Sequence, residues 1–311
     1  MMYKNFQEAY YNIVKDIYEN GRDVTVRGLE MREKIPVYFE IENPRDRLLN
    51  INCRQNIKRY IFGELLWYLS GRNDVKFIKK YSKMWERLSD DGIHNNSAYG
   101  NFIFNELCII GDGLSNDLLL NDVIDGKILS TKIQWDFVKE TLKKDPYSRQ
   151  AVIHIKPIQM YDTKDTVCTY FLQFFIRDNK LDMLVCMRSN DVIFGLTYDV
   201  FMFSFLQELM AAELGVELGK YMHLSANMHM YMKDEEKIKS ILSENCANRE
   251  TFKFAHIPTN FRDNDLKILL ELEEVYWGNI DKDIVLEEYK GDVEKLSPLG
   301  KQLLYLLLES D

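Results

Sequence analysis

The stretch YDVFMFSFLQELMAAEL, residues 198–214, is apolar on nearly every side and is followed directly by Gly215. Glycine often follows the last turn of a helix, because it accepts the left-handed backbone conformation found there. A helix without a polar face is normally buried in the middle of a protein. We therefore expect residues 198–214 to form the central helix of the fold.

The segment that precedes this helix favours strands. Residues 151–189 contain three β-rich runs, AVIHIKP, CTYFLQFFI and LDMLVCMRS, and the pair Asp178-Asn179 between the last two is typical of a hairpin turn. Strand and turn are also expected over residues 24–41.

Three further segments carry apolar residues at helical spacing. Residues 5–20 end before Gly21, and helices are also expected over residues 56–69 and 75–88. Together with the strands and the buried central helix, these segments predict an α+β, or layered α/β, fold.

Composition narrows the class of protein. The chain has 311 residues, 46% of them hydrophobic, and a net charge of -9. That sign argues against a nucleic-acid coat, which needs a basic surface. No apolar run approaches the roughly 20 residues of a membrane-spanning helix, and the start MMYKNFQEAY has no apolar signal core, so we expect a cytoplasmic protein without a membrane partner.

The five cysteines form no C-x-x-C pair and are widely spread: Cys53, Cys108, Cys168, Cys186 and Cys246. A disulfide framework and a structural zinc site are both poor interpretations of this spacing, and we predict no metal. Reduced thiols fit better, and one of them is a possible nucleophile.

Cys168 lies where a loop is expected to become a strand. A free cysteine is usually a small buried apolar residue, and that interpretation stays open. The nearby Arg149, Arg188 and Ser189 suggest a second one, because guanidinium groups lower the pKa of a thiol and bind phosphate through paired N–H groups. The same arginines could equally form surface ion pairs.

Other polar residues have two interpretations each. Asp199 is expected in the first turn of the central helix, where it either interacts with the helix dipole or recognises the amine edge of a ligand. Glu64 lies on an apolar helix and is either at its edge or buried for function. His229 and Tyr231 share one side if their segment is extended.

These motifs occur in the order found in one family. The sequence resembles thymidylate synthases and, more closely, the cytidylate hydroxymethylases related to them. The matching segments are ELLWYLSG (64–71), MWERLSDDG (84–92), AYG (98–100), DPYSRQ (145–150), Cys168 with FLQFF (171–175), RSNDVIFGLTYD (188–199) and HMY (229–231).

The resemblance implies a mixed sheet and a set of catalytic roles. Cys168 would add to C6 of a pyrimidine, and C5 would then attack the methylene group of 5,10-methylenetetrahydrofolate. Glu64 would order water and relay protons, and Tyr99 would assist proton removal from C5.

The resemblance also implies binding residues and a dimer. Arg188 and Ser189 would bind the 5′-phosphate together with Arg149 from the other subunit of a homodimer. The family completes this site with an N-terminal arginine, for which Arg27 is our choice over Arg22. The remaining contacts implied are His229 and Tyr231 with the sugar, Asp191 with the nucleotide and the folate, and Trp85 with the folate.

Asp199 is the departure that bears on the substrate. Thymidylate synthases have Asn here, whose amide complements uracil, whereas a carboxyl that keeps or shares a proton complements N3 and the 4-amino group of cytosine. We therefore expect dCMP or CMP as the substrate, since a site built on such hydrogen bonds discriminates strongly.

Two other features of the sequence also differ from those of the synthases. Val167 and Thr169 lie beside the nucleophile, where the synthases usually have Pro and His. The ending QLLYLLLESD lacks the short apolar tail that closes the active site over folate in the synthases. We expect a catalytic domain over residues 1–235 with a helical extension, residues 236–311, packed on it. The alternatives to a hydroxymethylase are a methyltransferase of the synthase type and a non-catalytic nucleotide-binding homologue.

Overall fold

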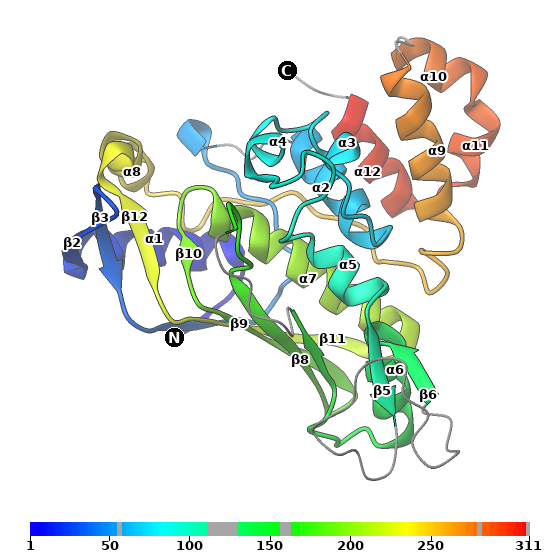
Figure 1. Ribbon diagram of the computed structural model, residues 1–311, viewed down its shortest axis with the longest axis horizontal. Coiled ribbons are helices and arrows are strands. Elements are labelled where there is room, and N and C mark those ends of the chain that lie inside the picture. Colours follow the sequence, from blue (N-terminus) through cyan, green and yellow to red (C-terminus); the bar gives the residue numbers. More distant parts are fainter. Residues whose placement is uncertain (55–57, 111–129, 156–162, 279–281, 309–311) are drawn as a thin grey trace.

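The computed structural model describes residues 1–54, 58–110, 130–155, 163–278 and 282–308 (Figure 1). Its main sheet has six strands: β11 runs parallel to β9 and β1 runs parallel to β4, while β8 runs antiparallel to both of its neighbours and β4 runs antiparallel to β11. The sheet is therefore mixed, and the predicted α+β class is confirmed. Its order is β1 (Met2–Tyr3), β4 (Val37–Ile41), β11 (Glu217–Ser225), β9 (Lys180–Met187), β8 (Thr169–Arg177) and β7 (Val152–His154).

The predicted central helix is α7 (Gly195–Leu214), which lies along one face of this sheet (Figure 1). It begins three residues earlier than expected and ends at Gly215, whose φ of 71° is left-handed as predicted. The Gln207 side chain donates to the carbonyl groups of Leu181 and Lys220. This buried amide fixes α7 against β9 and β11, because a polar group removed from water needs partners.

A smaller sheet brings together segments that are far apart in the chain. Its order is β10 (Asn190–Asp191), β12 (Met228–Tyr231), β3 (Leu29–Lys34) and β2 (Arg22–Val26). The helix α1 (Phe6–Asn20) packs on β3 and β12 and is capped by the Asn5 side chain, which accepts from the Glu8 N–H. Residues 190–191 therefore lie directly beside 228–229.

The helices α2 (Lys58–Leu69) and α5 (Tyr99–Phe104) cross at very short range. A Cβ atom on Gly100 would lie 2.2 Å from the Tyr68 carbonyl oxygen, so only glycine fits at this crossing. The predicted first residues of α2, 56 and 57, lie outside the described residues. The remaining short elements are α6 (Gln134–Lys144), the strand pair β5 (Leu107–Ile110) and β6 (Ser130–Ile133), and the 3-10 turns at Asn52–Arg54 and Met232–Asp234.

The prediction of one helix over residues 75–88 is wrong. The chain forms α3 (Val75–Ile78) and α4 (Met84–Leu88), with a break between them. In the break, Lys80 and Tyr81 both bind the carboxylate of Glu273, and the Tyr81 ring packs against Gly63. These tertiary contacts outweigh the helical pattern of the local sequence.

Several helices follow the last strand, β12. The helix α8 (Glu235–Ser243) packs on α1, and α12 (Pro298–Leu308) packs on α2 together with α9 (Asp265–Trp277). The helices α10 (Lys282–Glu288) and α11 (Lys290–Lys295) lie beside α9 (Figure 1). No helix among the described residues combines the length and the hydropathy that crossing a membrane requires.

Candidate active site

Cys168 lies at the start of β8, next to the end of β9. The Arg188 guanidinium donates to the Cys168 Sγ atom at 3.5 Å and to the carbonyl groups of Thr166 and Val167 at 2.8 Å. The Cys168 N–H donates to the Tyr99 hydroxyl at 3.0 Å. One arginine and one tyrosine therefore fix the position of the thiol.

The Cys168 side chain is partly exposed, but its environment favours the neutral thiol. Burial raises its pKa to about 11, and the charges of Asp199 and Asp165 act in the same direction, whereas Arg188 lowers it. The thiol ionises only if a bound molecule or a neighbouring base takes its proton.

Asp199 lies in the second turn of α7, because the helix begins at Gly195. The expectation that it occupies the first turn as a dipole partner is therefore wrong. Burial raises its pKa well above the usual value, as do the charges of Glu64 and Asp191, and the Asn190 amide lowers it. These surroundings favour the protonated form of the carboxyl.

Gly195 makes room between the groups at the start of α7. A Cβ atom there would lie 2.5 Å from the Asn190 Oδ1 atom and 3.4 Å from the Asp199 Oδ2 atom. The first distance is too short for any side chain. Glycine at 195 therefore lets Asn190 and Asp199 approach each other.

Glu64 is buried on α2, with 6% of its surface exposed. Its Oε1 atom accepts from the Tyr60 hydroxyl at 2.8 Å, and its Oε2 atom has no partner among the described residues. Burial raises its pKa to about 7, while the bond from Tyr60 lowers it. A carboxyl with this pKa exchanges a proton near neutral pH, as general acids and bases do.

Trp85 is linked to Glu64 through Tyr60, and Tyr99 is linked to Cys168. The Trp85 indole donates to the Tyr60 hydroxyl at 3.2 Å and packs on the Trp67 ring. The Tyr99 ring lies parallel to Phe203 and at an edge to Tyr68. Burial raises the pKa of Tyr99 well above 10, so its hydroxyl keeps its proton.

His229, Tyr231 and Asp191 meet through the pairing of β10 with β12. The His229 ring lies 5.2 Å from the Tyr231 ring, and its Nδ1–H donates to Asn227. The Asp191 carboxylate accepts from the backbone N–H groups of residues 193 and 194, which shapes the turn into α7. Burial raises the pKa of Tyr231, and the charge of Asp191 acts in the same direction.

The predicted phosphate-binding residues lie in three different parts of the structure. Ser189 follows Arg188 directly and is partly exposed. Arg149 is exposed before β7, and no contact links it to Arg188 among the described residues. Arg27 is exposed in the turn between β2 and β3 with a left-handed φ of 51°, whereas Arg22 forms an ion pair with Glu33.

Sequence reasoning missed several residues that the structure adds to the site. Tyr60 precedes Glu64 by four residues, a spacing that brings two side chains together on a helix and could have identified it. Asn190 donates to the His223 ring, which also contacts the Tyr221 hydroxyl. Burial lowers the pKa of His223 to about 3, so this ring stays neutral. No sequence pattern indicates that residues 190 and 223 meet.

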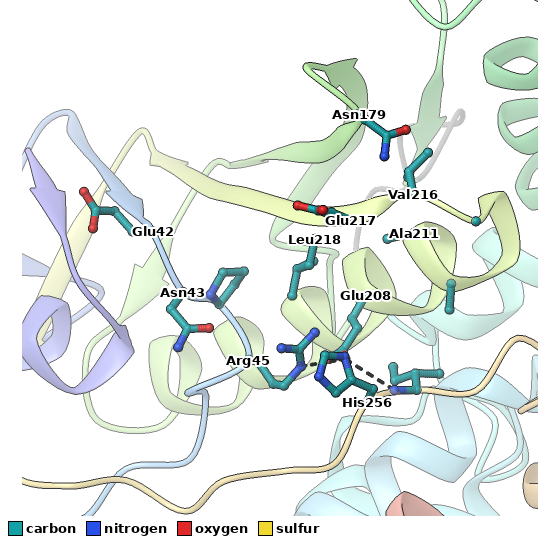
Figure 2. A pocket seen from close by; sticks show the side chains of 14 residues that line it. Glu42, Asn43, Arg45, Asn179, Glu208, Ala211, Val216, Glu217, Leu218 and His256 are labelled. Atoms are coloured by element: carbon teal, nitrogen blue, oxygen red, sulfur yellow. Dashed lines mark hydrogen bonds and ion pairs between the residues drawn. The ribbon is translucent and has the colours of Figure 1, made fainter.

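A separate hollow lies at the opposite end of α7 (Figure 2). It has a volume of about 620 Å³, and Figure 2 shows Arg45, Glu208 and His256 gathered on one side of it. The Glu208 carboxylate accepts from both Arg45 and Arg47. None of the site residues predicted from the sequence lines this hollow.

Glu64→Gln should change the pH dependence of stability. The folded protein holds the Glu64 proton up to about pH 7, whereas an unfolded chain releases it near 4.5. Between these values the folded state binds more protons, so the free energy of unfolding falls as the pH rises. The amide variant lacks this loss and should gain about 3 kcal/mol on the wild type from roughly pH 4 to pH 8. Urea unfolding at each pH measures the gain, and a difference that is constant with pH would contradict it.

Comparisons with known proteins bear on the family of this chain. The family model of thymidylate synthase matches residues 8–291. A deoxyuridylate hydroxymethyltransferase of Bacillus phage SP01 is 33% identical over 245 residues, which are 73% of this chain and 57% of that relative. A thymidylate synthase of Fusobacterium nucleatum is 27% identical over 86% of this chain and 95% of its own length.

A solved structure gives the same result for the fold. The thermostable thymidylate synthase A from Bacillus subtilis matches with a TM-score of 0.62 at 23% identity, over 83% of this chain and 91% of that one. The chain spans little more than half the length of the phage relative. The match to the family model nevertheless covers most of the chain, and the resemblance seen in the motifs is confirmed. This chain belongs to the thymidylate synthase family.

Proposed function

We propose that this protein transfers a one-carbon group to C5 of a cytidine monophosphate, dCMP or CMP, and gives a 5-hydroxymethyl product. The observation that carries the proposal is the contact between the Cys168 thiol and the Arg188 guanidinium, together with the Asp199 carboxyl near the N-terminal end of α7, whose pKa burial raises. A thiol, a guanidinium and an acid at one place are suited to addition to a pyrimidine whose phosphate the arginine binds.

Cys168 is the proposed nucleophile. Once ionised, its sulfur forms a bond to C6 of cytosine, and the electrons of the C5–C6 double bond move through C4 towards N3. Asp199 gives a proton to N3 as that charge develops, and its raised pKa favours the protonated form that this step requires. Arg188 stabilises the sulfur anion before the addition.

C5 is then the electron-rich carbon that forms the new bond. It afterwards loses its proton, and Tyr99, whose hydroxyl lies against the nucleophile's backbone, is placed to help move this proton to solvent. The S–C6 bond finally breaks and its electron pair returns to sulfur, while the C5–C6 and C4–N3 double bonds re-form and the proton on N3 returns to Asp199.

The family's one-carbon donor is 5,10-methylenetetrahydrofolate, and the residues present fit it. The Glu64 Oε2 atom is buried without a partner, in the same hydrogen-bonded chain as the Trp85 indole. Trp85 and Asp191 are the residues that we expect to hold the folate. When bound, it supplies the methylene carbon that C5 takes up.

The hydroxymethyl product requires water rather than hydride at the new carbon. Glu64 is the residue that we propose to order this water, because its Oε2 atom is unpartnered and its pKa lies near 7. The phage relative named a deoxyuridylate hydroxymethyltransferase supports this outcome. A methyltransferase of the synthase type is the second candidate, supported by the synthases that the chain also matches.

A homodimer is part of the proposal. The face of the main sheet that points away from α7 carries half-buried apolar residues that are not packed on the core, namely Phe171, Phe175, Leu184, Met222 and Leu224. A second copy covering this face would bury them. Arg149, exposed before β7, would then reach the phosphate site of the other subunit.

Cys168→Ala should abolish release of tritium from 5-tritiated dCMP and CMP, while nucleotide affinity changes less than about threefold, because only the covalent step needs the sulfur. Cys53→Ala, at an exposed thiol, is the matched control and should keep full activity. The experiment measures tritium release with methylenetetrahydrofolate present and nucleotide binding by calorimetry. No release from either cytidine nucleotide by the wild type would contradict the proposed function.

Asp199→Asn should move the preference from cytosine towards uracil by roughly 100-fold or more in the ratio of kcat/KM values, because the amide reverses the hydrogen-bond pattern. Parallel tritium-release assays with dCMP and dUMP measure this ratio. An unchanged ratio would show that Asp199 does not select the base.

Mixing Arg149→Ala with Cys168→Ala should restore activity if Arg149 serves the other subunit. Half of the dimers would be mixed, each with one intact site, so recovery should reach about a quarter of the wild-type rate. The variants are unfolded together, refolded and assayed. Recovery close to zero would place Arg149 in the site of its own chain.

A further inference from the structure

The same hydrogen-bond arrangement occurs on two adjoining faces of α2. On one, the Trp85 Nε1–H donates to the Tyr60 hydroxyl at 3.2 Å, which donates to the Glu64 Oε1 atom at 2.8 Å. On the other, the Trp277 Nε1–H donates to the Tyr81 hydroxyl at 3.1 Å, which donates to the Glu273 Oε1 atom at 2.7 Å. We refer to these as the Glu64 triad and the Glu273 triad.

The indole fixes the direction of both triads. An indole N–H only donates, so the tyrosine oxygen must accept from it and has its own hydrogen left for the carboxyl. Burial raises the pKa of Tyr60 and of Tyr81, so each phenol keeps that hydrogen. The Oε1 atom of each glutamate is therefore always an acceptor.

The two triads differ at the second carboxyl oxygen. In the Glu273 triad, the Lys80 ammonium binds Oε1 at 2.8 Å and Oε2 at 3.0 Å. In the Glu64 triad, Oε2 has no partner among the described residues. A cation therefore pairs with the Glu273 carboxylate, whereas no cation pairs with Glu64 among the described residues.

The other buried glutamates among the described residues are paired with a cation, as Glu273 is. Glu33 pairs with Arg22, and Glu208 pairs with Arg45 and Arg47. Unpaired buried carboxylates are costly, so a buried glutamate without a cation holds a proton or serves a ligand. Glu64 is the exception in this part of the chain.

We propose that Trp85 and Tyr60 are positioning residues that keep the exchangeable proton of Glu64 on its Oε2 atom, so that this oxygen alone gives or takes a proton during the reaction. When Oε2 gives the proton, the O–H bond breaks, its electron pair stays on the carboxylate, and the proton goes to the base or to a water bound there. The kinetic part of this inference rests on the proposed function, because it requires turnover.

The titratable groups that face Glu64 are few. Tyr60 and Tyr68 lie on α2 itself, and Asp199 faces it from α7. From α5, Tyr99 lies against Tyr68, and the charge that α9 brings to α2 is Glu273, which Lys80 already neutralises. Among these, Tyr60 donates the one hydrogen bond recorded to the Glu64 carboxyl.

Tyr60→Phe tests the proposal. Removal of the phenol takes away the bond that stabilises ionised Glu64, so the pKa of Glu64 should rise from about 7 by roughly 1 pH unit. The difference in unfolding free energy between Tyr60→Phe and the double variant Tyr60→Phe/Glu64→Gln, followed against pH without ligand, isolates this ionisation. Trp85→Phe should move it in the same direction by less, because Tyr60 remains but is free to rotate.

Tyr81→Phe is the matched control, because it removes the same kind of bond from the Glu273 triad. It should leave the ionisation of Glu64 where it is in the wild type. The limb of the kcat profile that reports Glu64 should move to higher pH in Tyr60→Phe by the same amount as the ligand-free value, and should not move in Tyr81→Phe.

The outcomes separate this inference from the proposed function. An unchanged Glu64 ionisation in ligand-free Tyr60→Phe would overturn the inference whatever the protein catalyses. A shifted ionisation with an unshifted kcat profile would overturn the role of Oε2 in turnover. If the Glu64 ionisation shifts in Tyr60→Phe but the wild type turns over no pyrimidine nucleotide, the result would support the placement of the proton and reject the proposed function.

Discussion

The enclosure of α7 is the constraint on which the other elements depend. Its sequence has no polar face, so the main sheet, α2 and the smaller sheet must surround it, and Gln207 fixes its direction through the carbonyl groups of β9 and β11. Because α7 starts where β9 and β10 end, the residues around 188–199 are brought to one place. The start of β8 reaches the same place through the guanidinium of Arg188.

Burial from water determines which side chains of the candidate active site are charged. Burial raises the pKa of Glu64, Asp199 and Cys168, and it therefore favours the neutral forms of both acids and of the thiol. Such a site presents a positive charge to an incoming phosphate without a strong negative field to oppose it. The protons of these neutral forms are then available when a base enters.

The partners of a buried carboxyl group indicate whether it stabilises the fold or is available for chemistry. Glu208 joins the loop at Arg45 and Arg47 to α7, and Glu273 joins α9 to Lys80, so these glutamates hold segments together. Glu64 has a phenol at one oxygen and no partner at the other among the described residues. The unmet hydrogen-bonding capacity of a rigid group is what a ligand or a water can use.

The sequence by itself determined the elements and the family. Apolar periodicity gave α1, α2, α7 and the hairpin at Asp178-Asn179, since local patterns report which side of an element is buried. It failed at residues 75–88, where Lys80 and Tyr81 turn towards Glu273, a residue almost two hundred positions away. Only the tertiary structure decided that Asp199 lies in the second turn of α7 and that Glu64 lacks a cation. Both facts depend on which distant segments remove water from a side chain, and no local pattern records that.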